Sequence, residues 1–544
     1  MDFRVNESGR RVQPGMAAFM ALLVAPAILY PEAARALEFT VYRMQQYTLQ
    51  GQPHGCRNSL VHAESRTLEA DLLTRRCVIM RLADFTLERY REVLGQSAGA
   101  MLMLVPQNSS EALQDQNFME EEMELLTNET MLPIYFALEN KDLLTVYEES
   151  KAVSKSLRSS SALEVIYGMI MGSGFQMVAG EAQSKPISDS VIVTLEGSLL
   201  GQGEAEELPT VVIVAHYDSF GAAPWLSFGA DSNGSGVAAL LELMRLFHGL
   251  YRDSRSRPRY NLLFALTGGG KFNYQGSKRW LEEHLDRAET SLFHDNVAFV
   301  MCLDTLANGD SLHLHASKPP KEGTAQWDFM AALQEVMNSP PFQGVNFSMV
   351  HKKINLGDEL LGWEHEQYSL RRIPAFTISH LDSHRHGLKN SILDRRKQSE
   401  TRTWQQSFFL LFQVRPDQLQ VFQGEQEVQE LRLAAILDWL VLQPRAAQLI
   451  HKDHPLLSTM EYLLGSYLAN VKRHVFKADE REPEFVFYDQ LKQTMTSYRV
   501  KPAVFDLFVA LVIAAYLGIV HQAIQSFSQM YSRFIQVILK PKIK

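Results

Sequence analysis

Two polar clusters in the middle of the chain have the composition of a hydrolytic metal site. The apolar run Val211–Ala215 ends in His216-Tyr217-Asp218, and a glycine-rich loop follows at Gly229–Gly236. Imidazoles and carboxylates hold the metal ions of many hydrolases, and a free carboxylate deprotonates the bound water. In an open α/β sheet such groups lie at the carboxyl ends of the strands. The pattern therefore predicts a metallo-hydrolase type of site on a mainly parallel sheet.

The segments around these clusters alternate between strand and helix patterns. Short apolar strands are expected at Val191–Leu195, Val211–His216, Asn261–Leu266, Val297–Asp304, Leu312–His315 and Ala375–Ser379. Helices are expected between them at Val237–Phe247, Ser277–Leu285 and Trp327–Met337. Such alternation is typical of an α/β fold with a doubly wound sheet and helices on both faces.

Residues 185–395 resemble the zinc aminopeptidase superfamily, which also contains nicastrin, glutamate carboxypeptidase and the transferrin receptor. The resemblance rests on the His-x-Asp pair and on the loop Gly-Ala-Asp-Ser-Asn-Gly-Ser-Gly. It implies that His216 matches the first zinc ligand, Asp218 the residue that orients it, and Asp304 a further ligand. The terminal histidine ligand matches His380, His384 or His386, which the spacing does not distinguish.

Three positions depart from the family pattern. The aspartate that bridges two zinc ions in the family falls on Ser232, with Asp231 one residue early. The family's Glu-Glu pair, which supplies the base and a ligand, reads Gly270-Lys271. A glycine cannot act as a base, and a protonated lysine repels a metal ion. The sequence therefore predicts a degenerate site with no metal, no cofactor and no peptidase activity. A phosphate-binding loop at Gly268–Lys271 is disfavoured because the P-loop spacing is absent.

The overall composition is that of a globular protein with additional apolar segments. Of 544 residues, 46% are hydrophobic and 21% charged, with a net charge of −9. This acidic balance gives no reason to expect direct nucleic acid binding. Three cysteines, Cys56, Cys77 and Cys302, are too few for a disulfide framework or a cysteine zinc site. The sequence does not decide whether Cys56 and Cys77 form a disulfide.

Both ends of the chain have the pattern of membrane targeting. Residues 1–36 combine basic residues, an apolar run and the triplet Ala34-Arg35-Ala36, which predicts a cleaved signal peptide. Residues 502–520 are almost wholly apolar and long enough for a transmembrane helix. Residues 521–544 contain basic residues and no acid, which suits a cytosolic tail. The bulk is therefore expected in a lumen or outside the cell.

Three further regions complete the expected organisation. Residues 37–160 are expected to form a small N-terminal lobe, with strands within Ser97–Pro106 and Leu132–Ala137. Residues 425–500 have an amphipathic pattern and are expected to be helical. Residues 394–420 fit neither pattern.

Four sequons lie in the portion expected to be lumenal. They begin at Asn108, Asn128, Asn233 and Asn346. Each predicts a glycosylation site, although such triplets also occur by chance. A glycan on Asn233 would sit on the loop that matches the metal site.

Within the superfamily the chain most resembles the nicalins, a family of endoplasmic reticulum membrane proteins. The resemblance is carried by Ala215–Gly236, Gly268–Lys278 and Pro483–Phe505. It implies a non-catalytic subunit whose partners are the Nodal modulator protein, a small multi-pass membrane protein and the translocon with its ribosome. It also implies a role in multi-pass membrane protein biogenesis and in Nodal signalling. An active lumenal metallo-exopeptidase and a cell-surface binding receptor are the alternatives.

Overall fold

The structure is a computed structural model. It describes residues 36–107, 116–157, 174–180, 182–204, 207–286, 296–307, 311–338, 345–358, 360–395, 428–479, 481, 483–501, 503–526, 531–532 and 535. Residues 1–35 of the expected signal peptide, the sequon asparagine Asn108, almost all of 394–420 and most of the expected cytosolic tail lie outside these residues.

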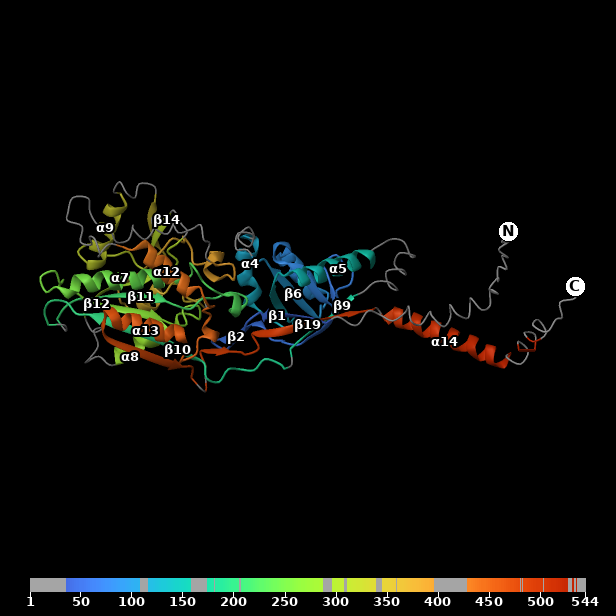
Figure 1. The fold of residues 1–544 in the computed structure, drawn as a ribbon. Helices are drawn as coiled ribbons and strands as arrows, with labels where there is room; N and C mark the ends of the chain where they lie inside the picture. The colour runs from blue at the N-terminus through green and yellow to red at the C-terminus, as the bar shows by residue number, and fades with distance from the viewer. Residues whose placement is uncertain are drawn as a thin grey trace, which may run out of the picture.

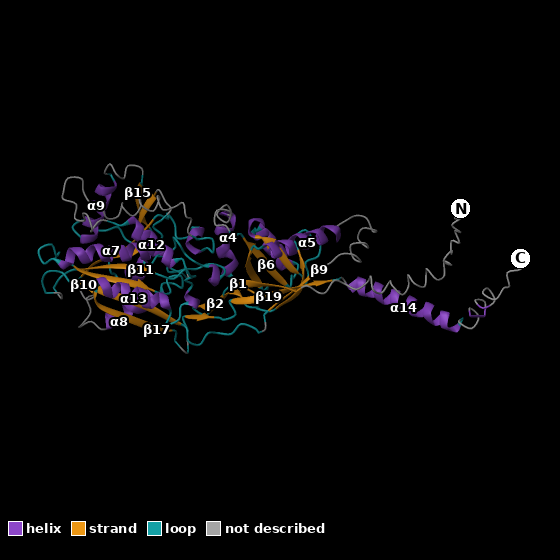
Figure 2. Ribbon diagram, in the orientation of Figure 1, coloured by secondary structure: helices purple, strands orange, loops and turns teal. Residues whose placement is uncertain are grey.

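The larger body is built on a mixed eight-stranded sheet (Figures 1 and 2). In spatial order its strands are β15 (Asn346–His351), β14 (Ser311–Ala316), β16 (Ala375–Ser379), β13 (Val297–Leu303), β11 (Thr210–His216), β12 (Asn261–Thr267), β10 (Val191–Leu199) and β17 (Ala469–Lys477). The four neighbours β16, β13, β11 and β12 run parallel. They are continuous apolar runs because parallel strands are buried on both faces. All six expected strands are confirmed.

Helices cover both faces of this sheet, as expected. One face packs against α7 (Gly234–Arg252), α9 (Ala325–Met337), α12 (Glu430–Leu440) and α13 (Pro455–Tyr467). The other packs against α8 (Gln275–Asp286) and α10 (His365–Leu370), which bury Trp280 and Tyr368. Two apolar cores, one on each face, therefore hold the ends of the central strands in fixed positions.

The smaller body is a closed barrel. Its strands, in order, are β1 (Ala36–Arg43), β19 (Lys492–Val500), β9 (Gly174–Ala179), β4 (Val61–Arg66), β5 (Cys77–Arg81), β6 (Ala100–Val105) and β8 (Ile134–Leu138). Helices α2 (Leu87–Gly95), α4 (Gln116–Thr127) and α5 (Lys141–Leu157) belong to the same part of the chain. Figure 1 shows the C-terminal strand β19 beside the N-terminal strand β1. The lobe is therefore not confined to residues 37–160.

The expectation that residues 425–500 are helical is correct only for α12 and α13. After α13 the chain forms β17 at the edge of the large sheet, then β18 (Phe485–Phe487) and β19. The strand β17 is mostly polar and half exposed, because an edge strand has one solvated side. Its partner β10 is distant in sequence, so local periodicity did not reveal the pairing.

A small sheet and a shared apolar core join the two bodies. The sheet contains β18, β2 (Gln46–Leu49), β3 (Gln52–Cys56) and β7 (Glu129–Thr130). The core brings Phe220 and Phe272 of the large body against Tyr47 of the lobe. Glu122 of α4 is fully buried there, and its carboxylate accepts hydrogen bonds from Ala222 N and Ser391 Oγ.

The three cysteines are buried and free. The Cys56 thiol donates a hydrogen bond to Leu132 O, so this buried thiol has a polar partner without forming a disulfide. No bridge joins Cys56 to Cys77, so the bridge left open by the sequence does not form in this structure.

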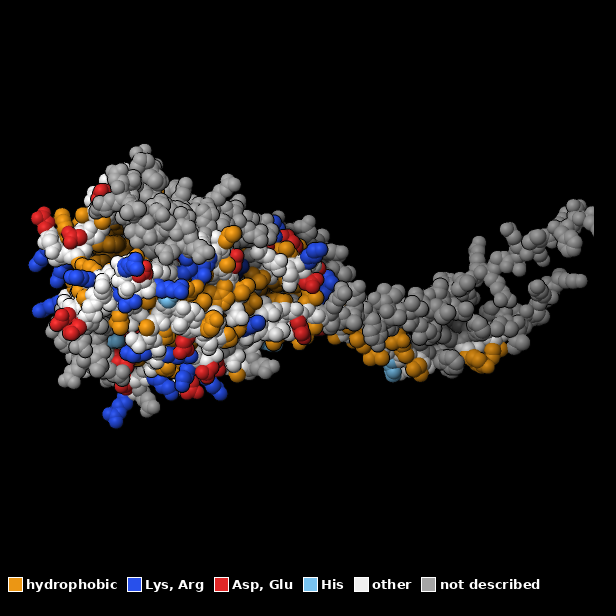
Figure 3. Space-filling model, turned by 60° about the vertical axis from the view of Figure 1, so that its left-hand side comes forward, with side chains coloured by type: hydrophobic (Ala, Val, Ile, Leu, Met, Phe, Trp, Pro, Cys, Tyr) orange, Lys and Arg blue, Asp and Glu red, His pale blue; other side chains and the backbone are white. Residues whose placement is uncertain are grey.

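The chain leaves the barrel as one long apolar helix, α14 (Ala503–Gln525). Within this helix, the segment Phe505–Gln522 has a mean hydropathy of 1.8 and is not buried in the protein. Figure 3 shows hydrophobic side chains along this helix, whereas charged side chains of both signs are scattered over the larger body. This helix matches the expected transmembrane segment and fits a single-pass membrane protein.

Candidate peptidase-like site

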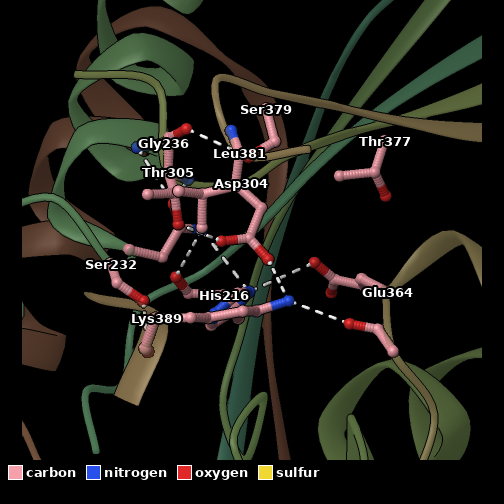
Figure 4. A network of polar contacts seen from close by, with 12 residues as sticks. His216, Ser232, Gly236, Asp304, Thr305, Glu364, Thr377, Ser379, Leu381 and Lys389 are labelled. Atoms are coloured by element: carbon pink, nitrogen blue, oxygen red, sulfur yellow. Dashed lines mark hydrogen bonds and ion pairs between the residues drawn. The ribbon is translucent and has the colours of Figure 1, made fainter. Parts of the chain in front are cut away.

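The residues expected in the site meet at the carboxyl ends of the parallel strands. His216 ends β11, Asp304 follows β13, and His380 follows β16. Gly270 and Lys271 lie in the loop after β12. The sequence placed these groups together because adjacent parallel strands end at the same edge. Figure 4 shows His216, Asp304 and Ser232 gathered there with two further residues, Glu364 and Lys389.

The glycine-rich loop is fixed by its own side chains. Asn233 caps α7 through Gly236 N, and its Nδ2 donates to His216 O and Leu303 O. Asp231 accepts a hydrogen bond from Ala307 N and pairs with His380, whose Nε2 lies 2.9 Å from Asp231 Oδ2. The contacts to His216, Leu303, Ala307 and His380 tie the loop to the ends of neighbouring strands. The Asp231 carboxylate is therefore bonded to protein partners and supports the loop.

Asp218 supports the loop after β12 rather than His216. Its two carboxylate oxygens accept hydrogen bonds from Gly270 N at 2.8 Å and Lys271 N at 3.3 Å. The resemblance implies that this residue orients the first zinc ligand. In this chain the contacts of His216 Nδ1 are instead Asn233 Nδ2 at 3.4 Å and Glu364 Oε2 at 3.5 Å.

Lys271 turns inward, but it bonds to neutral oxygens. Its ammonium donates to Ser232 Oγ at 2.6 Å and to Lys389 O at 2.8 Å. Burial lowers the pKa of Lys271 to about 8, although Asp304 opposes that shift. Positions 232 and 271, which match two metal ligands of the family, are thus joined by a hydrogen bond between an ammonium group and a hydroxyl group.

Lys389 is the cation that faces the remaining carboxylate. Its Nζ lies 3.0 Å from Asp304 Oδ2 and 3.8 Å from the centre of the Trp363 ring. It also donates to Gly362 O at 2.9 Å and Tyr274 OH at 3.2 Å. Figure 4 shows the extended side chain reaching Asp304. The side chain is almost fully buried, so every charge-assisted contact is made in a region of low dielectric.

The charge of Lys389 changes the titration of the carboxylate beside it. Burial by itself would raise the pKa of Asp304, but the Lys389 ammonium, together with Lys271 and a hydrogen bond from Thr305, outweighs burial and lowers the pKa well below its usual range. Asp304 is therefore ionised and its charge is balanced by a lysine.

Position 270 has no room for a catalytic side chain. A Cβ atom added to Gly270 would clash with the ring of His216. The glutamate base of the family therefore cannot be accommodated unless the imidazole moves.

Among the three candidate terminal histidines, the structure brings His380 to the site edge. His380 is buried, and Asp231 raises its pKa even though burial opposes that shift. His384 lies against the backbone of Gly362, and His386 caps the short helix Gly387–Asn390. Gly362 O in turn accepts from Lys389 Nζ, so His384 also borders the site, and its match to the terminal ligand stays a prediction.

The sequons differ in accessibility. Asn128 and Asn346 are exposed. Asn233 is fully buried, and the nitrogen to which a glycan would be attached donates two hydrogen bonds. A glycan at Asn233 would have to displace these hydrogen bonds and open the loop, and glycosylation at this position stays a prediction.

The arrangement does not suit the two zinc ions of the family. The ammonium groups of Lys271 and Lys389 both lie among the residues that match zinc ligands. Ser232 Oγ, at the bridging position, donates to Lys389 O at 2.6 Å and accepts from Lys271. Two cations would repel a divalent metal ion, and the hydroxyl is already committed to protein partners.

Sequence reasoning missed Lys389 and Glu364. Lysine is rarely buried, so the residue type of Lys389 gives no signal of a place in the site. Glu364 lies in the turn before α10 and accepts hydrogen bonds from Thr267 Oγ1 and Ser277 Oγ. Neither residue belongs to a recognisable motif, and only the packed fold brings them to His216.

Comparisons with known proteins agree with this architecture. Residues 191–349 match the model of peptidase family M28. The crystal structure of the gamma-secretase component nicastrin has the same fold, with a TM-score of 0.58 at 11% identity, covering 85% of this chain and 99% of nicastrin. The BOS complex subunit NCLN of Homo sapiens is 52% identical, over 96% of this chain and 94% of its own. Nicalin of Caenorhabditis elegans is 31% identical, over 66% of this chain and 64% of its own. The chain therefore belongs to the nicalin family, whose vertebrate members are named BOS complex subunit NCLN.

Proposed function

We propose that this protein is a non-catalytic, peptidase-like subunit of a BOS complex in the endoplasmic reticulum membrane. Its partners would be the Nodal modulator protein and a small multi-pass membrane protein. The complex would associate with the translocon and its ribosome, support the biogenesis of multi-pass membrane proteins and influence Nodal signalling. The naming of relatives that share half of its residues supports the membership.

One observation carries the non-catalytic part of the proposal. Lys389 Nζ lies 3.0 Å from Asp304, the carboxylate that matches a zinc ligand. A hydrolase of this family needs a metal ion there to activate water. An ammonium group supplies the balancing charge but cannot polarise a carbonyl or generate hydroxide as a metal ion does. The site therefore serves the stability of the fold.

Membership of the complex is tested by purifying the full-length chain from detergent-solubilised membranes. We expect the Nodal modulator protein and a small multi-pass protein to copurify, and crosslinking mass spectrometry to connect them to the chain. A chain that purifies alone would contradict the assembly role. Recovery of mature glycans after surface labelling would favour a cell-surface receptor instead.

Activity is tested separately on the same preparation. We expect no cleavage of amino-terminal or dipeptide substrates, with or without added zinc. Cleavage that disappears with chelator and in His216→Asn would show an active metallo-exopeptidase. Cleavage that persists in His216→Asn would identify a contaminant.

A further inference from the structure

A second cluster of imidazole and carboxylate groups lies outside the peptidase-like site. Glu196 comes from β10, His284 from α8 and His474 from β17. Among the residues that the structure describes, they form the one set of three such side chains whose ligand atoms all lie within 4.8 Å of one another. Three elements that are distant in sequence thus bring ligand-type groups to one point.

Both imidazoles present the same atom to one carboxylate oxygen. His284 Nε2 lies 2.7 Å from Glu196 Oε2, and His474 Nε2 lies 3.4 Å from it. Glu196 and His474 are buried, which removes competition from water. The other oxygen, Oε1, pairs with Lys472 at 3.4 Å, so Oε2 is left to face the histidines.

A further carboxylate determines how His474 is protonated. His474 Nδ1 lies 2.8 Å from Glu283 Oε2. A carboxylate can only accept, so Nδ1 carries the hydrogen and, in the neutral ring, Nε2 carries a lone pair. Metal-bound histidines are usually held in this way by a carboxylate on the opposite nitrogen.

The lone pair on His474 Nε2 is directed toward an anionic oxygen. This atom is buried and has no hydrogen-bond partner within the described part of the chain. A lone pair facing a carboxylate is repulsive unless a proton or a metal cation lies between them, so this position takes either a second ring proton or a metal ion. Trp280 Nε1 donates to the same Glu196 oxygen at 2.7 Å and so fixes the direction in which that oxygen points.

We propose that Glu196, His284 and His474 bind a divalent transition metal ion, for which Zn²⁺ is the best match. One carboxylate and two imidazoles are a known protein ligand set for zinc, whereas Mg²⁺ and Ca²⁺ prefer oxygen ligands alone. Ligand atoms around tetrahedral zinc are roughly 3.3 Å apart. The Glu196–His284 contact would therefore open slightly on binding, and water would complete the coordination.

The position of the site indicates a structural role. The strand β17 is the edge strand of the large sheet, and the chain continues from it through β18 and β19 into α14. A metal ion held by β10, α8 and β17 would tie this edge strand both to the sheet and to a covering helix. The ion would thereby fasten the segment that leads to the apolar helix.

The proposal is tested with the full-length chain in detergent, stripped with chelator and dialysed. Zinc content and melting temperature are then measured with Zn²⁺ or with Mg²⁺. We expect about one zinc per chain and a rise in melting temperature of several degrees with Zn²⁺ but not Mg²⁺. Glu196→Gln and His284→Asn should each abolish both effects. Glu283→Gln should weaken zinc affinity by about 10- to 100-fold, the usual cost of losing such a supporting carboxylate.

The matched control is His216→Asn, which removes the histidine of the peptidase-like site. If zinc and stabilisation survive in this variant, the metal is not at that site. Loss of zinc in His216→Asn with retention in His284→Asn would overturn the inference and would also contradict the non-catalytic function. An unchanged melting temperature of the wild type with zinc would overturn the inference alone. Should Glu196→Gln fail to fold, the comparison of His284→Asn with wild type decides the outcome.

Discussion

The ammonium group of Lys389 lies 3.0 Å from Oδ2 of Asp304, and both side chains are buried at the carboxyl ends of the parallel strands. Buried charges are costly unless they are paired and hydrogen-bonded. Lys389 meets this condition with Gly362 O and Tyr274 OH, and Asp304 accepts from Thr305 Oγ1. The pair is therefore an integral part of the fold.

Lys389→Met should lower the free energy of unfolding by about 3–5 kcal/mol, because it leaves the Asp304 carboxylate buried and unpaired. Adding Asp304→Asn should recover part of this loss, since the remaining buried charge is removed. Lys318→Met, at an exposed position, is the control and should change stability by less than about 0.5 kcal/mol. Denaturant unfolding of the four proteins in detergent is the measurement. A Lys389→Met variant as stable as wild type would contradict the role of the pair.

Lys271→Met should cost less than Lys389→Met. Lys271 bonds to Ser232 Oγ and to a backbone carbonyl, so its loss leaves neutral groups unsatisfied, at about 1–3 kcal/mol. The pairing of Lys271 with Asp304 or Asp218 that a vacated metal site would favour is not what the structure has. If Lys271→Met proved the more damaging change in the same unfolding assay, Lys271 would be the main balancing cation.

Gly270→Ala should destabilise the protein by about 1–3 kcal/mol, because the added methyl group would overlap the ring of His216. Gly465→Ala is the control, since a Cβ at Gly465 in α13 meets no neighbour. That change should be neutral or stabilise by up to about 1 kcal/mol. Thermal unfolding distinguishes the two. Equal stability of Gly270→Ala and wild type would show that the site has space for a side chain.

Glu122→Gln should change how stability depends on pH. Burial raises the pKa of Glu122 to about 7 from an ordinary value of 4.5, so the folded protein holds this proton more tightly than the unfolded chain does. Stability from the neutral carboxyl is fully present below pH about 4.5 and is lost as the pH rises through about 7, a change of up to about 3 kcal/mol. The difference in unfolding free energy between wild type and Glu122→Gln should follow this course.

The control for that experiment is Glu120→Gln, an exposed residue on the same helix. Its difference from wild type should be flat between pH 4.5 and 8. A flat difference for Glu122→Gln as well would mean that the buried carboxyl is ionised throughout this range.

Glycosylation should separate the exposed sequons from the buried one. If the bulk is lumenal, Asn128→Gln or Asn346→Gln should remove a glycan that an endoglycosidase for high-mannose forms also removes. Asn233→Gln should leave the gel mobility unchanged, because the folded protein has no room for a glycan on this buried side chain. Loss of a glycan in Asn233→Gln would instead mean that the loop is modified before it folds.

The predictable parts of the fold are those with strong local patterns. The strand β11 is a continuous apolar run ending in His216, and α7 begins at the N-cap Asn233, so sequence alone placed both. The strand β19 has only Met495 and Ser497 buried, and it pairs with β1 and β9, which are remote in sequence. The sequence of β19 therefore carries little strand signal, and it was included in the helical region expected for residues 425–500.

The residues of the site likewise fall into those that the sequence predicts and those that it does not. His216 ends an apolar strand and Asp304 directly follows one. The strand pattern therefore predicts where both residues lie. Lys389 lies in a short helical turn after β16, and its partner Asp304 follows the neighbouring strand β13, far earlier in the chain. The identity of a buried cation depends on such tertiary placement, which no local periodicity encodes.

The pairing of β1 with β19 also imposes an order on biosynthesis. The ladder runs from Ala36 opposite Tyr498 to Tyr42 opposite Lys492. The first described strand, β1, therefore cannot pair with β19 until that last described strand has been made. The ribosome must make nearly the whole chain, up to the threshold of α14, before the barrel can close. Until then β1 and β9 present open edges, which are templates for wrong pairing and binding sites for chaperones. We therefore expect quality control of this protein to respond to its C-terminal end, because a chain that stops before Lys492 keeps both edges open.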